Sequence, residues 1–121
     1  LQGRDDMPAL YAAMDLFVLA SHREGLSKSL LEATAMATAV VTCDIRGCRE
    51  IVIDGATGRL VPVRDSAALA ESVAALLHDD ALRRCMGAAG RERIVERYTE
   101  TRVAQRVLDL YTALVAGRDR C

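Results

Sequence analysis

The sequence predicts an α/β fold built on a parallel sheet, and two observations support this. Short apolar or β-branched runs recur along the chain, and each is followed by a loop that contains an acidic residue. A helical segment separates the first run from the second, which is the order expected of a doubly wound parallel sheet. The 121 residues are 51% apolar and 27% charged, as in an ordinary globular domain.

The strands and the first helix of this sheet are expected in the first half of the chain. Residues 16–19 are a short buried strand, and residues 27–37 are a helix with Ser27 as its N-cap. The β-branched residues 39–43 form the next strand, and a loop over residues 44–50 follows it. Residues 54–58 are a turn with two glycines that can take φ > 0, and residues 59–62 are a further strand.

The second half of the chain predicts three helices. Asp65 caps the first, Asp79 or Asp80 caps the second, and Thr99 opens the third. Gly87 and Gly90 weaken the second helix or allow close packing there. The residues expected to face the core are Leu69, Val73, Leu76 and Leu77 in the first helix, Leu82, Met86 and Ile94 in the second, and Val103, Val107, Leu110 and Leu114 in the third. The charged residues Arg91, Glu92, Arg93, Glu96 and Arg97 are expected to form a solvated face.

Two glutamates, Glu24 and Glu32, stand eight residues apart across the turn from the first strand to the first helix. Because 17 of the 121 residues are acidic, two glutamates at this spacing can occur by chance and are weak evidence of function. Their position between a strand and a helix makes the evidence stronger. Ligands of parallel α/β sheets bind at the carboxyl ends of the strands, where a helix N-terminus offers free N–H groups to anions. Carboxylates accept from hydroxyl groups, so the segment suits a sugar joined to a phosphate.

The chain resembles the C-terminal domain of retaining glycosyltransferases of family 4, which have the GT-B architecture. The segments that match the family are residues 15–21, the Glu24 and Glu32 pair with Leu30-Leu31-Glu32-Ala33, residues 40–41, residues 47–52, residues 54–62, Asp65 and Met86-Gly87. The sequence around residues 23–25 and 47–50 is similar to that of bacterial enzymes that build surface polysaccharides. The implied fold is a truncated Rossmann-like parallel sheet with flanking helices.

The resemblance also implies a reaction and the residues that perform it. A sugar would pass from a nucleotide-diphosphate sugar, UDP-linked, to a glycan or lipid-linked acceptor, with retention of configuration. Glu24 would be catalytic and would touch the sugar hydroxyls, whereas Glu32 would bind the ribose. The backbone of Gly25, Leu26 and Ser27 would contact the sugar and the phosphate. Neither a metal nor another cofactor is expected, and the expected location is the cytoplasm, with peripheral attachment to the inner face of the membrane left open.

One segment departs from the family pattern. Ala37-Thr38-Ala39 stands where the family usually has Gly, then Lys or Arg, then Pro, and Thr34 stands where Met is frequent. Loss of the glycine removes a helix stop, and loss of the proline removes a preset φ. We therefore expect the first helix to end less sharply here.

Residues 1–121 are expected to be part of a nucleotide-sugar-binding domain, including its closing helices, without the N-terminal acceptor domain. The isolated chain is therefore expected to be inactive. The alternative function is a non-catalytic nucleotide-sugar-binding or regulatory remnant. A receiver-like signalling domain with Asp44 as acceptor is disfavoured, because it needs a later lysine and the only lysine, Lys28, comes earlier.

Other classes of function find little support in the composition. The net charge is −1 and only 3% of residues are aromatic, so nucleic-acid binding is not expected. Four cysteines with no C-x2-C pair and two histidines make a zinc site improbable, and reduced thiols are favoured. Asp5 and Asp6 are interpreted as a helix cap ahead of Pro8, not as a metal-binding pair.

Overall fold

The structure, a computed structural model, describes residues 7–20, 27–98, 108–110 and 112–113. Its helices are α1 (Met7–Ala13), α2 (Lys28–Ala35), α3 (Arg46–Arg49), α4 (Ser66–Leu77) and α5 (Asp80–Tyr98). The strands are β1 (Phe17–Leu19), β2 (Val40–Cys43) and β3 (Arg59–Val61). Pro8 lies in the first turn of α1 as predicted, whereas Asp5 and Asp6 fall outside the described residues, as do Thr99, Val103, Val107 and Leu114.

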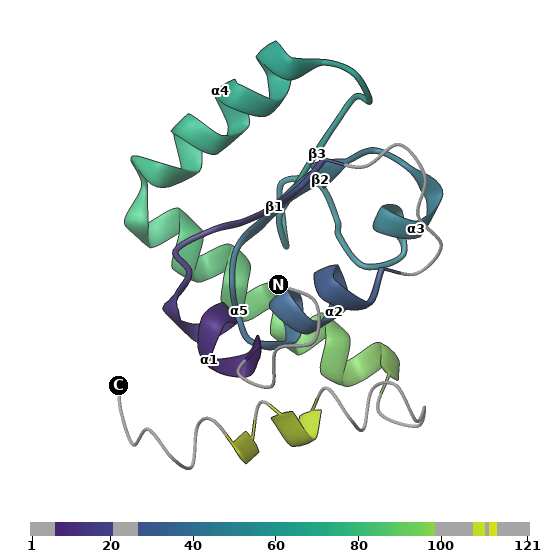
Figure 1. Cartoon of the computed structure of the whole chain (residues 1–121), viewed down its shortest axis with the longest axis vertical. Coiled ribbons are helices and arrows are strands. Elements are labelled where there is room, and N and C mark those ends of the chain that lie inside the picture. Colours follow the sequence, from purple (N-terminus) through teal and green to yellow (C-terminus); the bar gives the residue numbers. More distant parts are fainter. Residues whose placement is uncertain (1–6, 21–26, 99–107, 111, 114–121) are drawn as a thin grey trace.

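The three strands form one parallel sheet in the order β1-β2-β3, which confirms the predicted α/β class (Figure 1). Phe17 pairs with Val40 at the start of β1, and Cys43 pairs with Val61 at the end of β3. β2 is buried at all four positions because it lies between its two neighbours and is covered on both faces. A central strand with this continuous apolar pattern is typical of parallel sheets.

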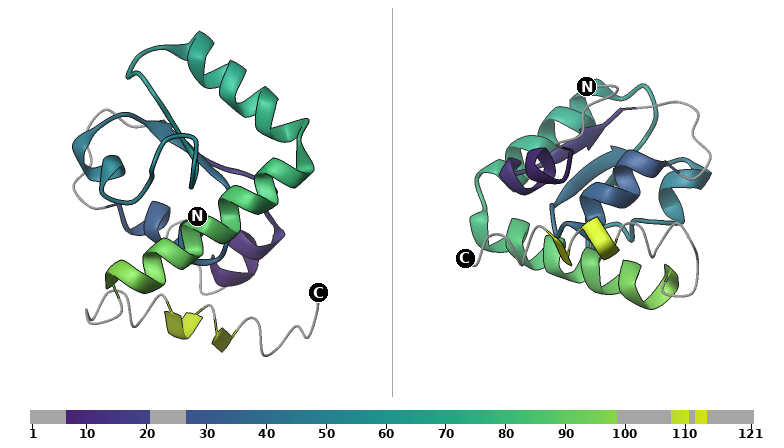
Figure 2. Two further views of the ribbon diagram at one scale, coloured as in Figure 1. Left: turned by 180° about the vertical axis from the view of Figure 1, so that it is seen from behind. Right: turned by 60° about the horizontal axis from the view of Figure 1, so that its bottom comes forward.

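Helices cover both faces of the sheet (Figure 2). The buried residues accordingly form two core clusters. On one face α2 buries Leu30 and Leu31 against Val40. On the other face Leu76 of α4 and Met86 of α5 pack with Val41. α5 contacts both α2 and α4 and so joins the two layers. Successive residues of β2 therefore serve opposite faces, as the two-residue period of a strand requires.

Helix α2 ends at Ala35 with a sharp left-handed turn, so the expectation of a looser end is wrong. Ala37 adopts φ 63°, the conformation that glycine takes most easily. The N–H of Ala37 donates to Thr34 O at 3.0 Å, and the N–H of Thr38 donates to Ala33 O at 3.1 Å. These two bonds make a Schellman motif, which is formed here by alanine without the usual glycine.

The two glycines of α5 allow this helix to lie directly against α2. A Cβ atom at Gly87 would lie 2.1 Å from the carbonyl oxygen of Ala37, and one at Gly90 would lie 2.9 Å from Cγ2 of Thr34. Both distances are shorter than any ordinary contact, so only glycine fits. The predicted close packing at these glycines is confirmed.

Several side chains lie elsewhere than the helical patterns predicted. Leu77 and Leu82 are exposed, because the core-facing stripes of α4 and α5 run through Leu76 and Met86 instead. The predicted loop over residues 44–50 contains the short helix α3. Its second residue, Gly47, lowers the helix propensity of this segment, so the sequence gives no signal for a helix here.

The charged residues of α5 do not form a purely solvated face. Arg93 Nε donates to the carbonyl oxygen of Ile51 at 3.3 Å, and Arg97 Nη2 lies 3.4 Å from Oε2 of Glu50. The arginines therefore tie α5 to the segment that follows α3.

Candidate functional site

The candidate site begins where α2 starts, at the carboxyl edge of the sheet. Thr42 Oγ1 donates to Leu19 O at 2.9 Å, which fixes the ends of β1 and β2 side by side. The C-terminal end of α2 connects to the start of β2 through four residues, so its N-terminal end lies near the strand ends. Parallel α/β sheets bind ligands at this edge.

Ser27 is the N-cap of α2, as the sequence predicted. It has extended backbone angles, and its Oγ accepts from the N–H of Leu30 at 3.2 Å. The N–H of Leu31 donates to the carbonyl oxygen of Ser27. Among the residues that the structure describes, the N–H groups of Lys28 and Ser29 have no acceptor, because they precede the first helical bond. These two donors can serve an anion such as a phosphate.

Glu32 lies in the second turn of the same helix, about 7.5 Å along the axis from Ser27 at 1.5 Å per residue. Its side chain is 13% exposed, and its Oε1 accepts from the hydroxyl of Tyr11 at 3.2 Å. Oε2 lies 3.9 Å from Nζ of Lys28, whose side chain is 70% exposed. One carboxylate oxygen is thus held by a buried hydroxyl, and the other lies toward an exposed lysine.

Tyr11 is a residue that the sequence analysis missed. Burial raises the pKa of its hydroxyl well above the ordinary range, and the negative charge and hydrogen bond of Glu32 raise it further. The phenol therefore remains protonated and remains a donor at neutral pH. No local sequence signal identifies Tyr11, because its contact with Glu32 depends on how α1 packs against α2.

The remaining predicted site residues, Glu24, Gly25 and Leu26, lie outside the described residues. Their roles therefore stay predictions from the sequence. Of the five predicted site residues, the structure places Ser27 and Glu32, one at the start and the other in the second turn of the same helix.

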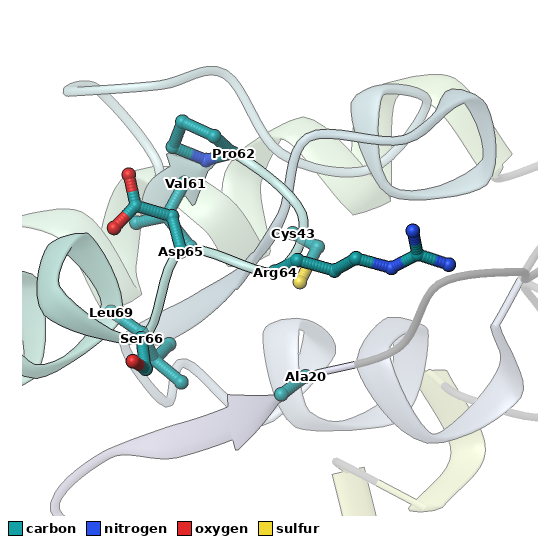
Figure 3. A pocket seen from close by; sticks show the side chains of 8 residues that line it. All are labelled: Ala20, Cys43, Val61, Pro62, Arg64, Asp65, Ser66 and Leu69. Carbon is teal, nitrogen blue, oxygen red and sulfur yellow. The ribbon is translucent and has the colours of Figure 1, made fainter.

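A hollow of about 240 Å³ lies at the carboxyl ends of the three strands, on the α4 face of the sheet (Figure 3). Its lining residues are Ala20, Cys43, Val61, Pro62, Arg64, Asp65, Ser66 and Leu69. Arg64 has φ 58° and extends past Cys43, away from the carboxylate of Asp65 (Figure 3). Neither Ser27 nor Glu32 lines this hollow, so we place the candidate site at α2, where the amides and the carboxylate lie together.

The cysteines of the described part do not face one another. Cys43 lines the hollow on the α4 face, whereas Cys48 is buried on the α2 face with its Sγ 3.1 Å from Oγ1 of Thr42. Among the described residues, no three of the His, Cys, Asp and Glu side chains are grouped so that they could hold a metal ion. No helix in this part of the chain is both long and apolar enough to cross a membrane.

A parallel α/β sheet with a helix that starts at its carboxyl edge is an architecture in which many proteins bind nucleotides. The family model "Glycosyl transferases group 1" matches residues 1–93. The chain therefore belongs to this glycosyltransferase family, and its fold is that of GT-B enzymes.

Relatives of known description agree with this family. The capsular polysaccharide biosynthesis glycosyltransferase CapM of Staphylococcus aureus is 30% identical over 91% of this chain and 29% of its own length. The C-terminal domain of the group 1 glycosyltransferase LpcC of Francisella tularensis is 31% identical, with a TM-score of 0.73 over 81% of this chain and 50% of that one. Staphylococcus aureus TarM, solved with UDP, is 25% identical, with a TM-score of 0.76 over 90% of this chain and 22% of that one. The chain spans less than a third of the curated relatives that it matches first.

Proposed function

We propose that this chain is the donor-binding part of a longer retaining glycosyltransferase that takes its sugar from a UDP-sugar and passes it to a glycan or lipid-linked acceptor. One observation carries the proposal: at its start α2 presents two N–H groups that have no acceptor among the described residues, and it carries the carboxylate of Glu32 about one turn further along. The UDP bound in the solved TarM complex supports the choice of nucleotide.

The proposed donor lies along the start of α2. The N–H groups of Lys28 and Ser29, together with the backbone of Gly25, Leu26 and Ser27, face the diphosphate and the sugar. Oε2 of Glu32 accepts from the ribose hydroxyls. Helix-terminal amides placed in this way stabilise the negative charge that develops on the leaving phosphate.

Glu24 is proposed to act on the sugar itself. In retaining transfer the bond between the anomeric carbon and the phosphate oxygen breaks, and the acceptor oxygen forms a new bond to that carbon. The ring becomes positive in the transition state, and a carboxylate near the reacting carbon stabilises this charge. The electron pair of the broken bond leaves with the phosphate oxygen, and this oxygen takes the proton of the acceptor hydroxyl, so that UDP and the glycosylated acceptor are the products.

Glu32→Gln in the complete enzyme is expected to weaken UDP binding by about 1–3 kcal/mol, because an acceptor that bears a charge is replaced by a neutral amide. Titration calorimetry of UDP against both forms measures the difference. Equal affinities would show that Glu32 does not bind the ribose. Glu71→Gln on the exposed surface of α4 is the matched control and should leave the affinity unchanged.

The isolated 121-residue chain is expected to transfer no sugar and to bind UDP only in the millimolar range or more weakly, about −4 kcal/mol. The chain spans less than a third of the curated relatives that it matches first, and the resemblance places the basic residues that neutralise the diphosphate ahead of the matching segments. β1 is also an edge of the described sheet, with Val18 41% exposed, so the chain should self-associate. Turnover assays with UDP-sugars and sedimentation at several concentrations test this.

The same measurements separate the proposal from the alternative of a non-catalytic binding or regulatory remnant. Transfer of sugar by the isolated chain would contradict the proposal that this chain only binds the donor and that transfer needs the longer enzyme. Micromolar UDP binding by the chain alone, with no turnover in any longer form, would favour the remnant.

A further inference from the structure

We propose that Tyr11 is a positioning residue for donor binding: it holds the carboxylate of Glu32 in the orientation that receives the ribose. The inference rests on the proposed function and adds a residue that neither the motif nor the family comparison assigns. Its starting point is the hydrogen bond from the Tyr11 hydroxyl to Oε1 of Glu32, at 3.2 Å, between helices α1 and α2.

Tyr11 is itself held firmly in place. Its side chain is 2% exposed, and its ring meets the ring of Phe17 edge to face, with centroids 5.9 Å apart and planes at 71°. Its carbonyl oxygen accepts from Oγ1 of Thr38 at 3.1 Å. The hydroxyl therefore has a fixed position, which is what a group needs in order to orient another side chain.

The two oxygens of Glu32 have unequal partners. Oε1 accepts from the buried hydroxyl of Tyr11, whereas among the residues that the structure describes Oε2 has Lys28 alone as a partner, at 3.9 Å. An ion pair at that distance with a 70% exposed lysine restricts a side chain weakly. Tyr11 is thus the contact that limits rotation of the carboxylate, and Oε2 remains free to accept from a hydroxyl.

A glutamate that is ordered before the ligand arrives binds it more tightly than one that must be ordered on binding. Removal of the Tyr11 hydroxyl leaves Glu32 charged, but its carboxylate can then rotate. The loss is expected in the contribution of the ribose hydroxyls, because Tyr11 is buried and acts through the carboxylate of Glu32.

The test compares UDP with 2′,3′-dideoxy-UDP in the complete enzyme, by calorimetry. The ratio of the two affinities measures what the ribose hydroxyls contribute, and any unfolded fraction cancels from it. Wild type is expected to prefer UDP by about tenfold or more, and Glu32→Gln should abolish the preference. Tyr11→Phe should lower the ratio by about three- to tenfold.

Thr34→Val is the matched control. It also removes a buried hydroxyl from the neighbourhood, since Thr34 Oγ1 donates to Leu30 O within α2, but it does not touch Glu32. Its ratio should equal that of wild type even if its stability falls. A wild-type ratio in Tyr11→Phe, with the preference lost in Glu32→Gln, would overturn the role of Tyr11 and leave the proposed function standing. Equal affinities for the two nucleotides in wild type would overturn both.

Discussion

Gly87→Ala is expected to lower the free energy of unfolding of the chain by about 1–3 kcal/mol, even though alanine is the better helix former. The new Cβ would lie 2.1 Å from the carbonyl oxygen and 2.9 Å from the carbonyl carbon of Ala37. These are backbone atoms of the left-handed residue that ends α2, so they cannot move aside as a flexible side chain would. Helix α5 would have to shift away from α2, which loosens the contact between the two layers.

Urea-induced unfolding of the 121-residue chain measures this effect, and the neighbouring position provides the control. Ala88 is exposed on the same helix, so Ala88→Gly reports helix propensity alone, about 1 kcal/mol of destabilisation. If propensity also decided the outcome at position 87, Gly87→Ala would stabilise the chain by a similar amount. A stabilised Gly87→Ala variant would therefore contradict the close packing described above.

Glu24→Ala in the complete enzyme is expected to reduce turnover by about a hundredfold or more while UDP affinity stays nearly intact. Glu24 is proposed to stabilise charge on the sugar ring, an interaction that strengthens only in the transition state. The variant should therefore lose kcat without a matching loss of nucleotide binding. Steady-state kinetics and UDP calorimetry on the same preparation measure the two quantities.

Glu32→Gln is expected to show the opposite behaviour, because this substitution should weaken UDP binding. Glu92→Ala, on the exposed face of α5, controls for the removal of any carboxylate and should change neither quantity. Turnover of Glu24→Ala within about threefold of wild type is too small a change for a lost transition-state contact, and it would refute the catalytic role.

The elements that the sequence predicted well are those whose signals are local. Ser27 and Asp65 were predicted as helix caps, and each accepts from the N–H three residues ahead. The apolar runs at β1 and β2 also predicted these two strands and the parallel sheet that they form. Capping and strand composition act over a few residues, so they can be read without knowing the fold.

The features that were missed depend on contacts between distant segments. The burial of Leu76 in place of Leu77 depends on where α5 crosses α4. Ala37 takes a glycine conformation because Gly87 and the Schellman bonds hold it there. In the candidate site, Glu32 was predicted from its motif, but Tyr11 was found only from the packing of α1 on α2. Arg64, with φ 58° beside the hollow, had no signal either, because the sequence there suggests only a helix cap.

The joint between Ala37 and Gly87 also restricts how sequences of this kind can diverge. The left-handed turn directs the carbonyl of Ala37 at Gly87, one of the two positions of α5 that have no side chain. A larger residue at position 87 is compatible only with a helix end that directs its carbonyl elsewhere. The two positions therefore cannot vary independently, although they lie far apart in the chain, and a substitution at one changes which substitutions the other accepts.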